Sequence, residues 1–457
     1  MTNKTSPKVL IIAYYWPPSG GGGVQRWLKF TKYLPYYGWH PIVYVPYNPQ
    51  YPLVDPTLMQ SVPAHVEVIK GHIWEARRVY RRLKKIRHGK SWSAAPEMDT
   101  LFFRDPKNLS WFGRLSLFLR SNLFVPDSRS LWINPSVRRL RKWLAKHPVD
   151  AIISTGPPHS CHMIGLKLHR STGIPWIADF RDPWLEIDYF PQLMLTTYTR
   201  RQHEKMQEAV LKHADKVITV SWSWANLFRK YGAKEVEVIT NGFDAQDLIA
   251  SNTSLRADQK FIIANIGTLE MDRNPRALWN AMRKLLLKYP ELQSRIEIHL
   301  AGKTDTVILQ DAGDLASLIQ LRGYLSHQEA LKLMRESDLL LLPLNEISSA
   351  NTMGRIPGKL FEYMAMGKPI LMLGNKDSDA GKLVTQLNDS WCIDNTDEGS
   401  VYQILHGLLF NPPASRTARS FDASRFERQK LTGDLARVLN QVVHAETAPV
   451  PESQLNF

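Results

Sequence analysis

The sequence predicts an α/β protein made of two doubly wound, Rossmann-like domains that face each other across a cleft. The first observation is length, because 457 residues exceed what one ordinary core accommodates. The second is that short apolar segments alternate with amphipathic segments through the first half of the chain. The third is that the same alternation begins again near residue 261. Apolar strands separated by helices indicate parallel sheets that are covered on both faces.

The individual elements follow from the local spacing of apolar residues. In the first half, strands are expected at 8–15, 41–46, 151–154, 175–180 and 216–220, and helices at 24–34, 160–171 and 196–213. In the second half, strands are expected at 261–267, 296–302, 339–343 and 370–373, with an amphipathic helix at 277–286. Each half therefore has enough strands for a sheet of its own.

The domain boundaries follow from the polar stretch near residue 250. We expect a first domain over 1–240, with a basic insert at about 70–147, and a second domain over 241–415. A C-terminal helix is expected over 416–446, because apolar residues recur there at helical spacing. Residues 447–457 have the composition of a loose tail.

The positive charge is concentrated in one part of the chain. The formal net charge is +15, and residues 70–147 alone contain 19 Lys and Arg against 5 Asp and Glu. Basic amphipathic segments with interleaved tryptophans, here at 77–88, 112–124 and 138–147, favour an anionic membrane surface. Nucleic acid and a simply solvated surface are the alternatives. We expect the membrane surface and no nucleic acid.

Cysteine content bears on the compartment. The two cysteines, Cys161 and Cys392, lie far apart in the sequence, so they form no disulfide framework and no metal-ligand spacing. The apolar N-terminal segment runs into a glycine loop without a cleavage-like sequence, and we interpret it as a buried strand rather than a signal peptide. A cytoplasmic protein is expected, with peripheral contact to the inner face of the plasma membrane as the further expectation.

The most informative stretch is Pro-Gly-Lys-Leu-Phe-Glu-Tyr-Met-Ala-Met-Gly-Lys-Pro at 357–369. A loop that enters a helix at Gly358 presents backbone N–H groups to a phosphate, and Lys359 adds a cation there. Glu362, one turn further along, has the chemistry to accept hydrogen bonds from the two hydroxyls of a ribose. The stretch therefore predicts a nucleoside-diphosphate site, although an ordinary joint between a helix and a strand has the same pattern.

Pro-Pro-Ser-Gly-Gly-Gly-Gly at 17–23 leaves the first strand and enters a helix. Gly21, Gly22 and Gly23 let the backbone approach a ligand closely, and the helix N-terminus favours an anion. The spacing matches neither the dinucleotide fingerprint nor the phosphate loop of nucleotide hydrolases. A flexible turn is the alternative interpretation.

Three further positions follow expected strands. Gly267 opens a loop in which Arg273 has the geometry to bind two phosphate oxygens. His159 could donate to a sugar hydroxyl or a phosphate. Asp182 lies with Asp179 and Arg181 at a strand end, where they form either an internal ion pair or polar contacts to an acceptor.

No metal centre is expected from the sequence. Asp-Ser-Asp at 377–379 has the Asp-x-Asp spelling of metal-dependent sugar transferases. Matches of three residues are common by chance, however, and this one lies in an expected polar loop. Paired catalytic carboxylates, zinc-ligand spacing and a catalytic triad are not apparent in the sequence.

Taken together, these motifs resemble the GT-B glycosyltransferases, in particular the retaining group called family 4, over roughly residues 8–415. Gly-Thr-Leu-Glu-Met-Asp-Arg at 267–273 is similar to the family's Gly-Arg-Leu-x-x-x-Lys, with Arg273 in the place of the phosphate-binding lysine. Glu-Tyr-Met-Ala-Met-Gly-Lys-Pro at 362–369 is similar to its Glu-Ala-Met-Ala-x-Gly-x-Pro, whose glutamate binds the ribose. The glycine loop and His159 resemble the family's N-terminal loop and a histidine near the donor sugar.

The resemblance implies a metal-independent hexosyltransferase without a cofactor. The donor would be a nucleoside-diphosphate sugar, and the acceptor a glycan or a lipid-linked molecule in surface polysaccharide synthesis. Gly21, Gly22, Gly23, Gly267, Arg273, Gly358, Lys359 and Glu362 would bind the donor, while His159, Asp182, Arg273 and Lys359 would serve catalysis. The resemblance also implies that the C-terminal helix returns to the first domain.

The sequence departs from the family pattern at two positions. Gly354 stands where many members have a glutamate that touches the donor sugar, and Thr268 replaces an arginine of the diphosphate loop. Sugar recognition would then pass to neighbours such as Asn351 and Arg355. The base, sugar, acceptor and linkage stay open.

Two other functions fit the same residues. A nucleotide-sugar 2-epimerase of this fold would need no acceptor. A basic protein that binds membrane or nucleic acid without catalysis would leave its nucleotide pocket idle, and the departures at Gly354 and Thr268 are compatible with such a protein.

Overall fold

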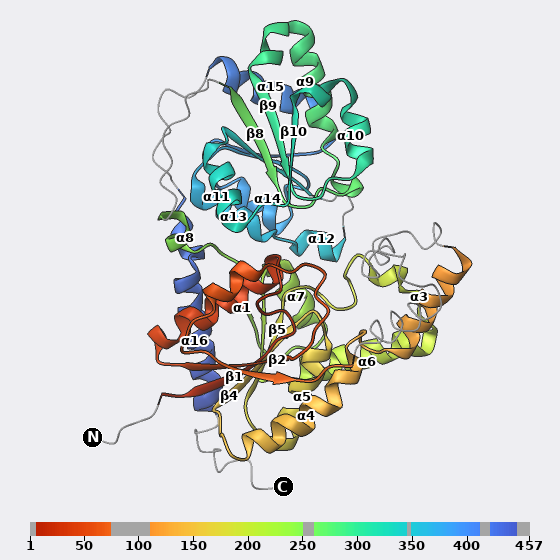
Figure 1. The fold of residues 1–457 in the computed structure, drawn as a ribbon, viewed down its shortest axis with the longest axis vertical. Helices are drawn as coiled ribbons and strands as arrows, with labels where there is room; N and C mark the ends of the chain where they lie inside the picture. Colours follow the sequence, from red (N-terminus) through yellow and green to blue (C-terminus); the bar gives the residue numbers. More distant parts are fainter. Residues whose placement is uncertain (1–5, 75–109, 250–259, 345–348, 412–420, 446–457) are drawn as a thin grey trace. The chain divides into compact units, whose positions relative to one another are not determined.

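The computed structural model describes residues 6–74, 110–249, 260–344, 349–411 and 421–445 (Figure 1). The chain divides into two compact units. Unit 1 comprises Met1–Thr240 together with Leu431–Phe457, and unit 2 comprises Asn241–Lys430. Much of the basic insert, residues 75–109, lies outside the described residues.

Unit 1 is built on a seven-stranded sheet in the order β3-β2-β1-β4-β5-β6-β7, in which every neighbouring pair is parallel. The strands are β1 (Lys8–Ile12), β2 (His40–Pro46), β3 (Glu67–Gly71), β4 (Ala151–Gly156), β5 (Trp176–Phe180), β6 (Lys216–Thr219) and β7 (Val236–Val238). The strand order reverses between β1 and β4. Ligands of such sheets bind beyond the carboxyl ends of the strands at this reversal.

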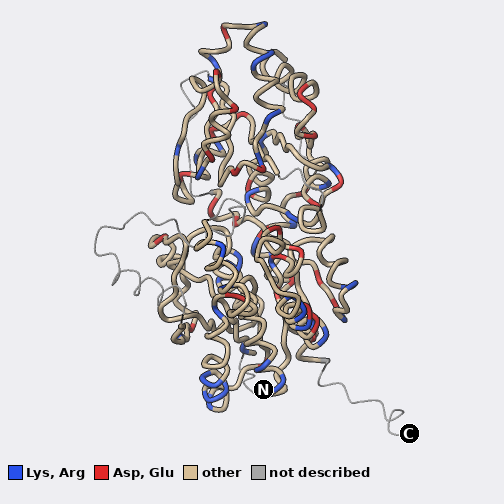
Figure 2. The backbone as a smooth tube through the Cα atoms, turned by 90° about the vertical axis from the view of Figure 1, so that its right-hand side faces the viewer, with Lys and Arg blue, Asp and Glu red and all other residues tan. Residues whose placement is uncertain are grey.

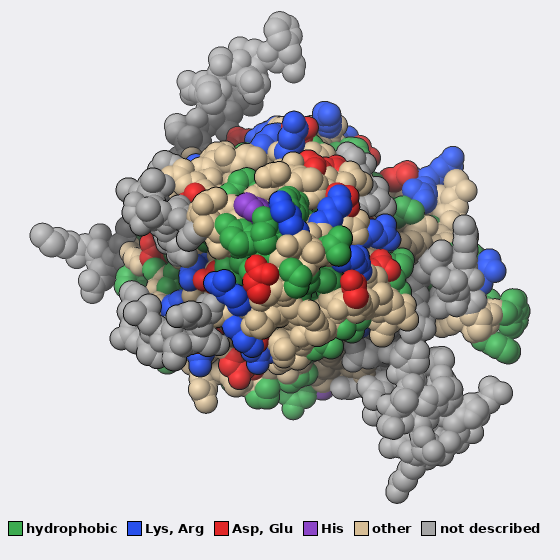
Figure 3. Space-filling model, turned by 90° about the horizontal axis from the view of Figure 1, so that it is seen from above, with side chains coloured by type: hydrophobic (Ala, Val, Ile, Leu, Met, Phe, Trp, Pro, Cys, Tyr) green, Lys and Arg blue, Asp and Glu red, His purple; other side chains and the backbone are tan. Residues whose placement is uncertain are grey.

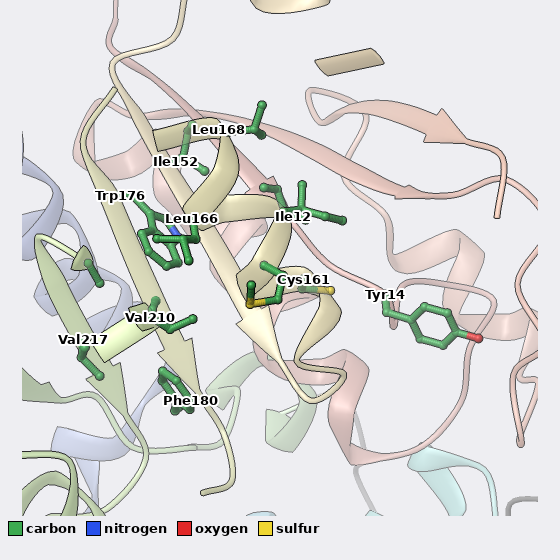
Figure 4. Packing of buried hydrophobic residues seen from close by; sticks show 14 of the residues in the cluster. Ile12, Tyr14, Ile152, Cys161, Leu166, Leu168, Trp176, Phe180, Val210 and Val217 are labelled. Carbon is green, nitrogen blue, oxygen red and sulfur yellow. The ribbon is translucent and has the colours of Figure 1, made fainter. Parts of the chain in front are cut away.

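Helices cover both faces of this sheet, as Figure 1 shows. They are α1 (Gly22–Tyr33), α3 (Trp111–Leu123), α4 (Ser130–Leu144), α5 (Ser160–Thr172), α6 (Thr197–His213), α7 (Trp222–Lys230) and α16 (Arg428–Ala445). The alternation of side chains along β1 separates two cores. Val9 and Ile11 pack with α1 and α16, whereas Leu10 and Ile12 pack with α4 to α7. Figure 4 shows the second cluster around Cys161 and Trp176.

The C-terminal helix is part of unit 1. Leu435, Val438 and Leu439 of α16 are buried against the sheet face that α1 also covers. The indole Nε1 of Trp39 donates to Asn440 Oδ1 at 3.0 Å. Gly433 allows close contact, because a Cβ there would lie 3.0 Å from the ring of Tyr37. The last helix therefore completes a layer whose strands lie more than 200 residues earlier in the chain.

Unit 2 repeats the doubly wound pattern with a six-stranded sheet in the order β10-β9-β8-β11-β12-β13, again parallel throughout. The strands are β8 (Phe261–Ile266), β9 (Ile296–Ala301), β10 (Ile319–Gly323), β11 (Leu339–Pro343), β12 (Ile370–Leu373) and β13 (Ser390–Ile393). Its helices are α8 (Ala245–Ile249), α9 (Arg276–Lys288), α10 (Thr306–Ala312), α11 (His327–Glu336), α12 (Ala350–Gly354), α13 (Gly358–Met366), α14 (Asp379–Val384) and α15 (Glu398–Phe410).

The two faces of this second sheet carry different helices. Leu339 and Leu341 pack with α9, α10 and α15, while Leu340 and Leu342 pack with α11, α13 and α14. The prediction of two doubly wound, Rossmann-like domains is confirmed. The Asp-Ser-Asp stretch differs from the expected loop, because Ser378 caps α14 and Asp379 is the buried first residue of that helix.

All nine strands expected from the sequence are present, and four were missed. The missed strands are β3, β7, β10 and β13, which are the edges of the two sheets. Edge strands are covered by fewer neighbours, so their sequences need less apolar character: β10 is mostly exposed and β13 is only half-buried. Within the described ranges, no helix combines the length and apolar character needed to cross a membrane.

Candidate active site

In unit 2, two glycines bring the loops after β8 and β9 together. Gly267 and Gly302 have φ angles of 124° and 114°, in the region that favours glycine. A Cβ on Gly302 would lie 2.7 Å from the backbone of Gly267, which no side chain tolerates. A Cβ on Gly267 would in turn lie 3.3 Å from Lys359 Nζ. The ammonium group of Lys359 therefore lies beside the carboxyl end of β8.

Lys359 belongs to the first turn of α13. Pro357 occupies the N-cap position without a side-chain cap, and the first turn contains no acidic residue. Gly358 is exposed, and a Cβ there would meet no atom within 4 Å. The hydroxyl of Tyr363 accepts a hydrogen bond from the N–H of Ile266 at 3.0 Å, which ties α13 to the end of β8. The uncapped N–H groups and the ammonium thus share one edge of the sheet.

The surroundings of Lys359 disfavour its own charge. Burial, together with the positive charge of Arg273, lowers the pKa of Lys359 to about 7. No residue in the described part of the chain pairs with its ammonium by a hydrogen bond or an ion pair. Arg273 is 28% exposed in its side chain and lies 4.0 Å from Asp272, which is a long ion pair. A bound anion would offset both effects, so these two cations suit a diphosphate.

Glu362 follows Lys359 by three positions on α13, so the two side chains leave the helix on the same side. It is half-buried and thus remains accessible from the surface. Gly354 ends α12, where Asn351 is buried and Arg355 is half-buried. Ribose binding by Glu362 and sugar recognition by Asn351 or Arg355 remain predictions.

In unit 1, the glycine loop joins β1 to α1. The N–H of Gly20 donates to Leu53 O at 2.9 Å, which attaches the start of the loop to the segment after β2. Gly21 has a φ angle of 86°, and Gly21 and Gly22 are both exposed. Helix α1 has no side-chain cap and no acidic residue in its first turn. Its first N–H groups are therefore directed at the surface, as an anion site requires.

His159 lies at the start of α5, directly after β4 and two prolines. Its ring is 5% exposed and stacks on Trp184, with 4.3 Å between ring centroids and 2° between planes. Neither ring nitrogen has a hydrogen-bond partner among the residues the structure describes. Burial, and then the neighbouring His162, lower the pKa of His159 well below its usual value. The imidazole is therefore neutral, and it can donate one hydrogen bond and accept another.

At the strand end 179–182, where an ion pair and acceptor contacts were both open, Asp179 forms an ion pair with Arg26 of α1. Asp179 is fully buried, and its carboxylate accepts from Arg26 Nη2 at 3.0 Å. Trp27 Nε1 and Thr155 Oγ1 donate to the same carboxylate, each at 2.8 Å. Asp179 thus joins α1, β4 and β5 as a structural centre. Asp182 is half-buried and stays a candidate for acceptor contact.

Sequence reasoning missed Arg26 as the partner of Asp179. The two residues are 153 positions apart, so no local spacing connects them. One signal was present: Arg26 interrupts an apolar helix between Val24 and Trp27, both of which are buried. A basic residue at such a position needs a buried carboxylate.

The predicted site residues thus form two sets, one in each unit. In unit 2, Gly267, Arg273 and Lys359 are brought together around the first turn of α13. In unit 1, the glycine loop, His159 and Asp182 follow β1, β4 and β5, which are neighbours in the sheet. Basic and acidic residues both occur along the tube in Figure 2, and both are interspersed over the face in Figure 3.

Two family models match this chain. Residues 100–247 match the model described as glycosyltransferase family 4, and residues 260–410 match the model described as glycosyl transferases group 1. Together the two matches cover about two-thirds of the sequence and most of both units. Among curated proteins, none matches.

Solved structures with the same two-domain fold span nearly the whole chain. A sucrose-phosphate synthase from Thermosynechococcus elongatus has 14% identity, covers 96% of this chain and 100% of its own, and gives a TM-score of 0.58. WaaG, a glycosyltransferase involved in lipopolysaccharide biosynthesis, has 13% identity, coverage of 96% and 98%, and a TM-score of 0.52. A putative UDP-N-acetylglucosamine 2-epimerase from Listeria monocytogenes has 12% identity, coverage of 98% and 99%, and a TM-score of 0.54. At these identities the likeness shows the GT-B fold alone.

Proposed function

We propose, since this chain belongs to the GT-B glycosyltransferases of the family 4 type, that it transfers a sugar from a nucleoside diphosphate. The acceptor is a glycan or a lipid-linked molecule, and the anomeric configuration of the sugar is retained. The observation that carries the proposal is the position of Lys359 in the first turn of α13, with its ammonium beside Gly267. Arg273 is close enough to contribute to the lowered pKa of Lys359. A diphosphate is an anion that fits two adjacent cations and an uncapped helix N-terminus.

In the proposed reaction, the bond between the anomeric carbon and the leaving phosphate oxygen breaks. A bond forms from the same carbon to an acceptor oxygen, and the proton of that acceptor hydroxyl is released. Lys359, Arg273 and the N–H groups at Gly358 and Lys359 stabilise the negative charge that develops on the diphosphate. Because protein cations supply this charge, we propose a metal-independent hexosyl transfer.

The remaining residues have distinct proposed roles. Glu362 accepts hydrogen bonds from the ribose hydroxyls and orients the nucleoside. The neutral ring of His159 hydrogen-bonds the donor sugar, and Asp182 faces the acceptor. The N–H groups of Gly21, Gly22 and Gly23 bind an anionic group of the donor.

A thermal-shift screen against UDP-, GDP- and ADP-sugars tests the donor class. The true donor should raise the unfolding temperature of the wild type, because a ligand that binds only the folded state stabilises it. The variant Glu362→Ala should lose that shift, while Glu398→Ala, which is on the surface helix α15, should keep it. An unchanged shift in the Glu362 variant would refute the placement of the ribose.

A nucleotide-sugar 2-epimerase is the second candidate, since one solved structure of this fold carries that description. Incubation with the donor alone separates the two functions. An epimerase converts the sugar without a second substrate, whereas a transferase needs an acceptor to form a glycoside. Failure to release nucleoside diphosphate with any donor or acceptor would favour binding without catalysis.

The acceptor is proposed to lie at a membrane surface, in surface polysaccharide synthesis. Helix α3 supports this, because its apolar side is turned outward. Leu117 and Ser121 are buried, while Trp111, Phe112 and Leu123 are 69%, 77% and 70% exposed. At 100° per residue these three, together with Leu115, Phe118 and Leu119, fall in one arc opposite Leu117. Asn122 fastens the helix through Met194 O and the N–H of Thr196.

The charges around α3 fit an anionic lipid surface. Residues 110–147 contain eight Lys and Arg and a single acidic residue, Asp127. That carboxylate is engaged with the N–H and hydroxyl of Ser160 at the start of α5. An apolar arc with aromatic residues and basic neighbours is typical of a helix that lies in the membrane interface.

Liposome flotation tests this contact. Wild-type protein should float with vesicles that contain anionic lipid, and the double variant Trp111→Ser, Phe112→Ser should lose most of that binding. Leu287→Ser is the matched control, since Leu287 of α9 is 87% exposed but lies in unit 2. Equal absence of binding to anionic and neutral vesicles would remove the membrane proposal.

A further inference from the structure

Arg181 connects two loops that carry proposed site residues. It directly follows β5, and its backbone N–H donates to Gly156 O at 3.0 Å. Its guanidinium donates from Nη1 to Gly23 O at 3.0 Å and from Nη2 to Pro157 O. One side chain therefore holds the first turn of α1 against the loop that precedes His159.

Within the described ranges, the guanidinium of Arg181 forms no ion pair. Asp179, the nearest acidic residue before it in the sequence, is occupied by Arg26. No carboxylate in the described part of the chain pairs with Arg181. The guanidinium contacts the two carbonyl oxygens and lies 5.8 Å from the centre of the Tyr15 ring. The guanidinium lies at the N-terminal end of α1, where the peptide dipoles already contribute positive charge. Two positive groups held together in this way favour an anion nearby.

We propose that Arg181 is a positioning residue that sets the spacing between the glycine loop and the loop carrying His159. By holding Gly23 O, it fixes the N–H groups of the first turn of α1, to which the proposed function assigns an anion. The bridge itself stands on the contacts of unit 1, whereas its catalytic consequence rests on the proposed glycosyl transfer. Small displacements of positioned groups lower rates strongly, so loss of the bridge should affect turnover more than donor binding.

Gly23 provides an independent way to break the bridge. A Cβ at this position would lie 2.8 Å from Arg181 Nη1, so only glycine leaves room for the guanidinium. The variant Gly23→Ala would push the end of this flexible side chain away while the arginine and its charge remain. The variant Arg181→Lys keeps the charge but has no planar fork to reach both carbonyl oxygens. Both changes should therefore break the bridge between the two loops, one through steric displacement and the other through loss of the planar guanidinium.

Hydrogen–deuterium exchange of the full-length protein measures the bridge without any substrate. In Arg181→Lys and in Gly23→Ala, amides in 20–25 and 157–162 should exchange at least about tenfold faster, with other peptides unchanged. Arg170→Lys is the matched control, because Arg170 is an exposed arginine of α5 that contacts His213. Unchanged exchange in the two loops of both variants would overturn the proposal.

Steady-state release of nucleoside diphosphate, with the donor found in the thermal-shift screen, measures the catalytic consequence. Arg181→Lys should lose about tenfold or more in kcat, with the donor KM within about threefold of wild type, and Gly23→Ala should show a comparable loss in kcat. A fall in kcat that merely follows the loss of folded protein would overturn the positioning role. If the wild type released no nucleoside diphosphate with any donor, the proposed function would be overturned instead. The exchange experiment would still test the bridge, because it needs no substrate.

Discussion

At the scale of single residues, the buried charge of Asp179 and the half-buried charge of Lys359 have opposite meanings. Asp179 is saturated by Arg26, Trp27 and Thr155, so its carboxylate is part of the framework. Lys359 has no described partner, and its pKa falls to about 7 because burial and Arg273 both penalise its charge. A charged group that is paired within the fold indicates a structural role, and a charged group without a described partner indicates a ligand-binding role.

Asp179→Ala should destabilise the protein by about 3–5 kcal/mol, because it leaves the guanidinium of Arg26 buried without a counter-charge. Chemical denaturation followed by far-UV circular dichroism measures this. Asp188→Ala is the control, since Asp188 is an exposed residue of the same unit and should change the unfolding free energy by less than about 1 kcal/mol. Equal stability of the two variants would contradict the structural role of Asp179.

Donor affinity should weaken as the pH rises above about 7. Below its pKa of about 7, Lys359 is already protonated in the free protein and binds the diphosphate directly. Above that pKa a proton must be taken up on binding, so affinity should fall by up to about tenfold per pH unit. Calorimetry with the intact donor, whose diphosphate does not titrate in this range, measures the dependence. Lys359→Arg should bind with a flat profile because its guanidinium stays charged; identical slopes for both proteins would reject the assignment.

At the scale of elements, the sites depend on close approach of neighbouring loops and helices. The loops after β8 and β9 touch only because Gly267 and Gly302 lack side chains. The N-cap of α5 and the helices α5 and α6 bring His159, His162 and His203 against an aromatic cluster. In this cluster Trp184 stacks on His159 and donates to His203 Nδ1 at 3.1 Å. The loop contact requires glycine at both positions, and the aromatic cluster requires neutral histidines. Both are therefore sensitive to small chemical changes.

Gly302→Ala should destabilise the protein by about 1–3 kcal/mol and weaken donor binding. The new Cβ would lie 2.7 Å from the backbone of Gly267, and the φ angle of 114° is unfavourable for alanine. Thermal unfolding with and without donor measures both effects. The control is Gly407→Ala in α15, where a Cβ meets no atom within 4 Å and should stabilise the helix slightly. Wild-type donor affinity in the Gly302 variant would contradict the role of this loop contact.

The protein should lose stability as the pH falls from about 6.5 towards 4. Burial lowers the pKa of His162 to about 3 and that of His203 to about 4, so the folded state resists protonation that the unfolded chain accepts. At pH 5 each histidine should cost about 2 kcal/mol relative to pH 8. Thermal melts across this range measure the slope. His203→Gln should reduce it, whereas His213→Gln, at an exposed position of α6, should not; the same slope in all three proteins would contradict the assignment.

At the scale of the whole molecule, the C-terminal helix belongs to the first unit although it comes last in the sequence. Residues from Leu431 onward belong to unit 1, although unit 2 precedes them. Helix α16 shares a core with β1 and α1, and Leu435, Val438 and Leu439 are completely buried there. The last helix is therefore part of the sheet packing of unit 1.

Deletion of 431–457 should unfold unit 1 or render the protein insoluble. Each buried leucine or valine contributes about 1.5–3 kcal/mol, and the six apolar residues that α16 places in this core together match the whole stability of a typical domain. Solubility and thermal unfolding measure the effect. Deletion of 447–457 alone, the tail expected from the sequence, is the control and should leave unfolding unchanged. A soluble, cooperatively folding protein without 431–457 would contradict the packing.

Much of the fold was predictable from the sequence because central strands carry a strong signal. Strands such as β4 and β11 are buried on both faces and are therefore apolar throughout. The edges β3, β7, β10 and β13 escaped prediction because each has a neighbouring strand on one side only and is short or interrupted by polar residues. The glycine loops and the first turn of α13 were predictable for another reason, because their residue types are tied to local backbone geometry.

Local sequence thus determined the fold class and the positive charge near α3, and it supplied the two sets of candidate site residues. Tertiary structure alone decided which charges are neutralised: Arg26 meets Asp179 across 153 positions, Arg181 meets two carbonyl oxygens, and Lys359 meets no described partner at all. The physical reason is range. Helix and strand preferences act over a few residues, whereas the partner of a buried charge is selected by packing between strands that are distant in the sequence.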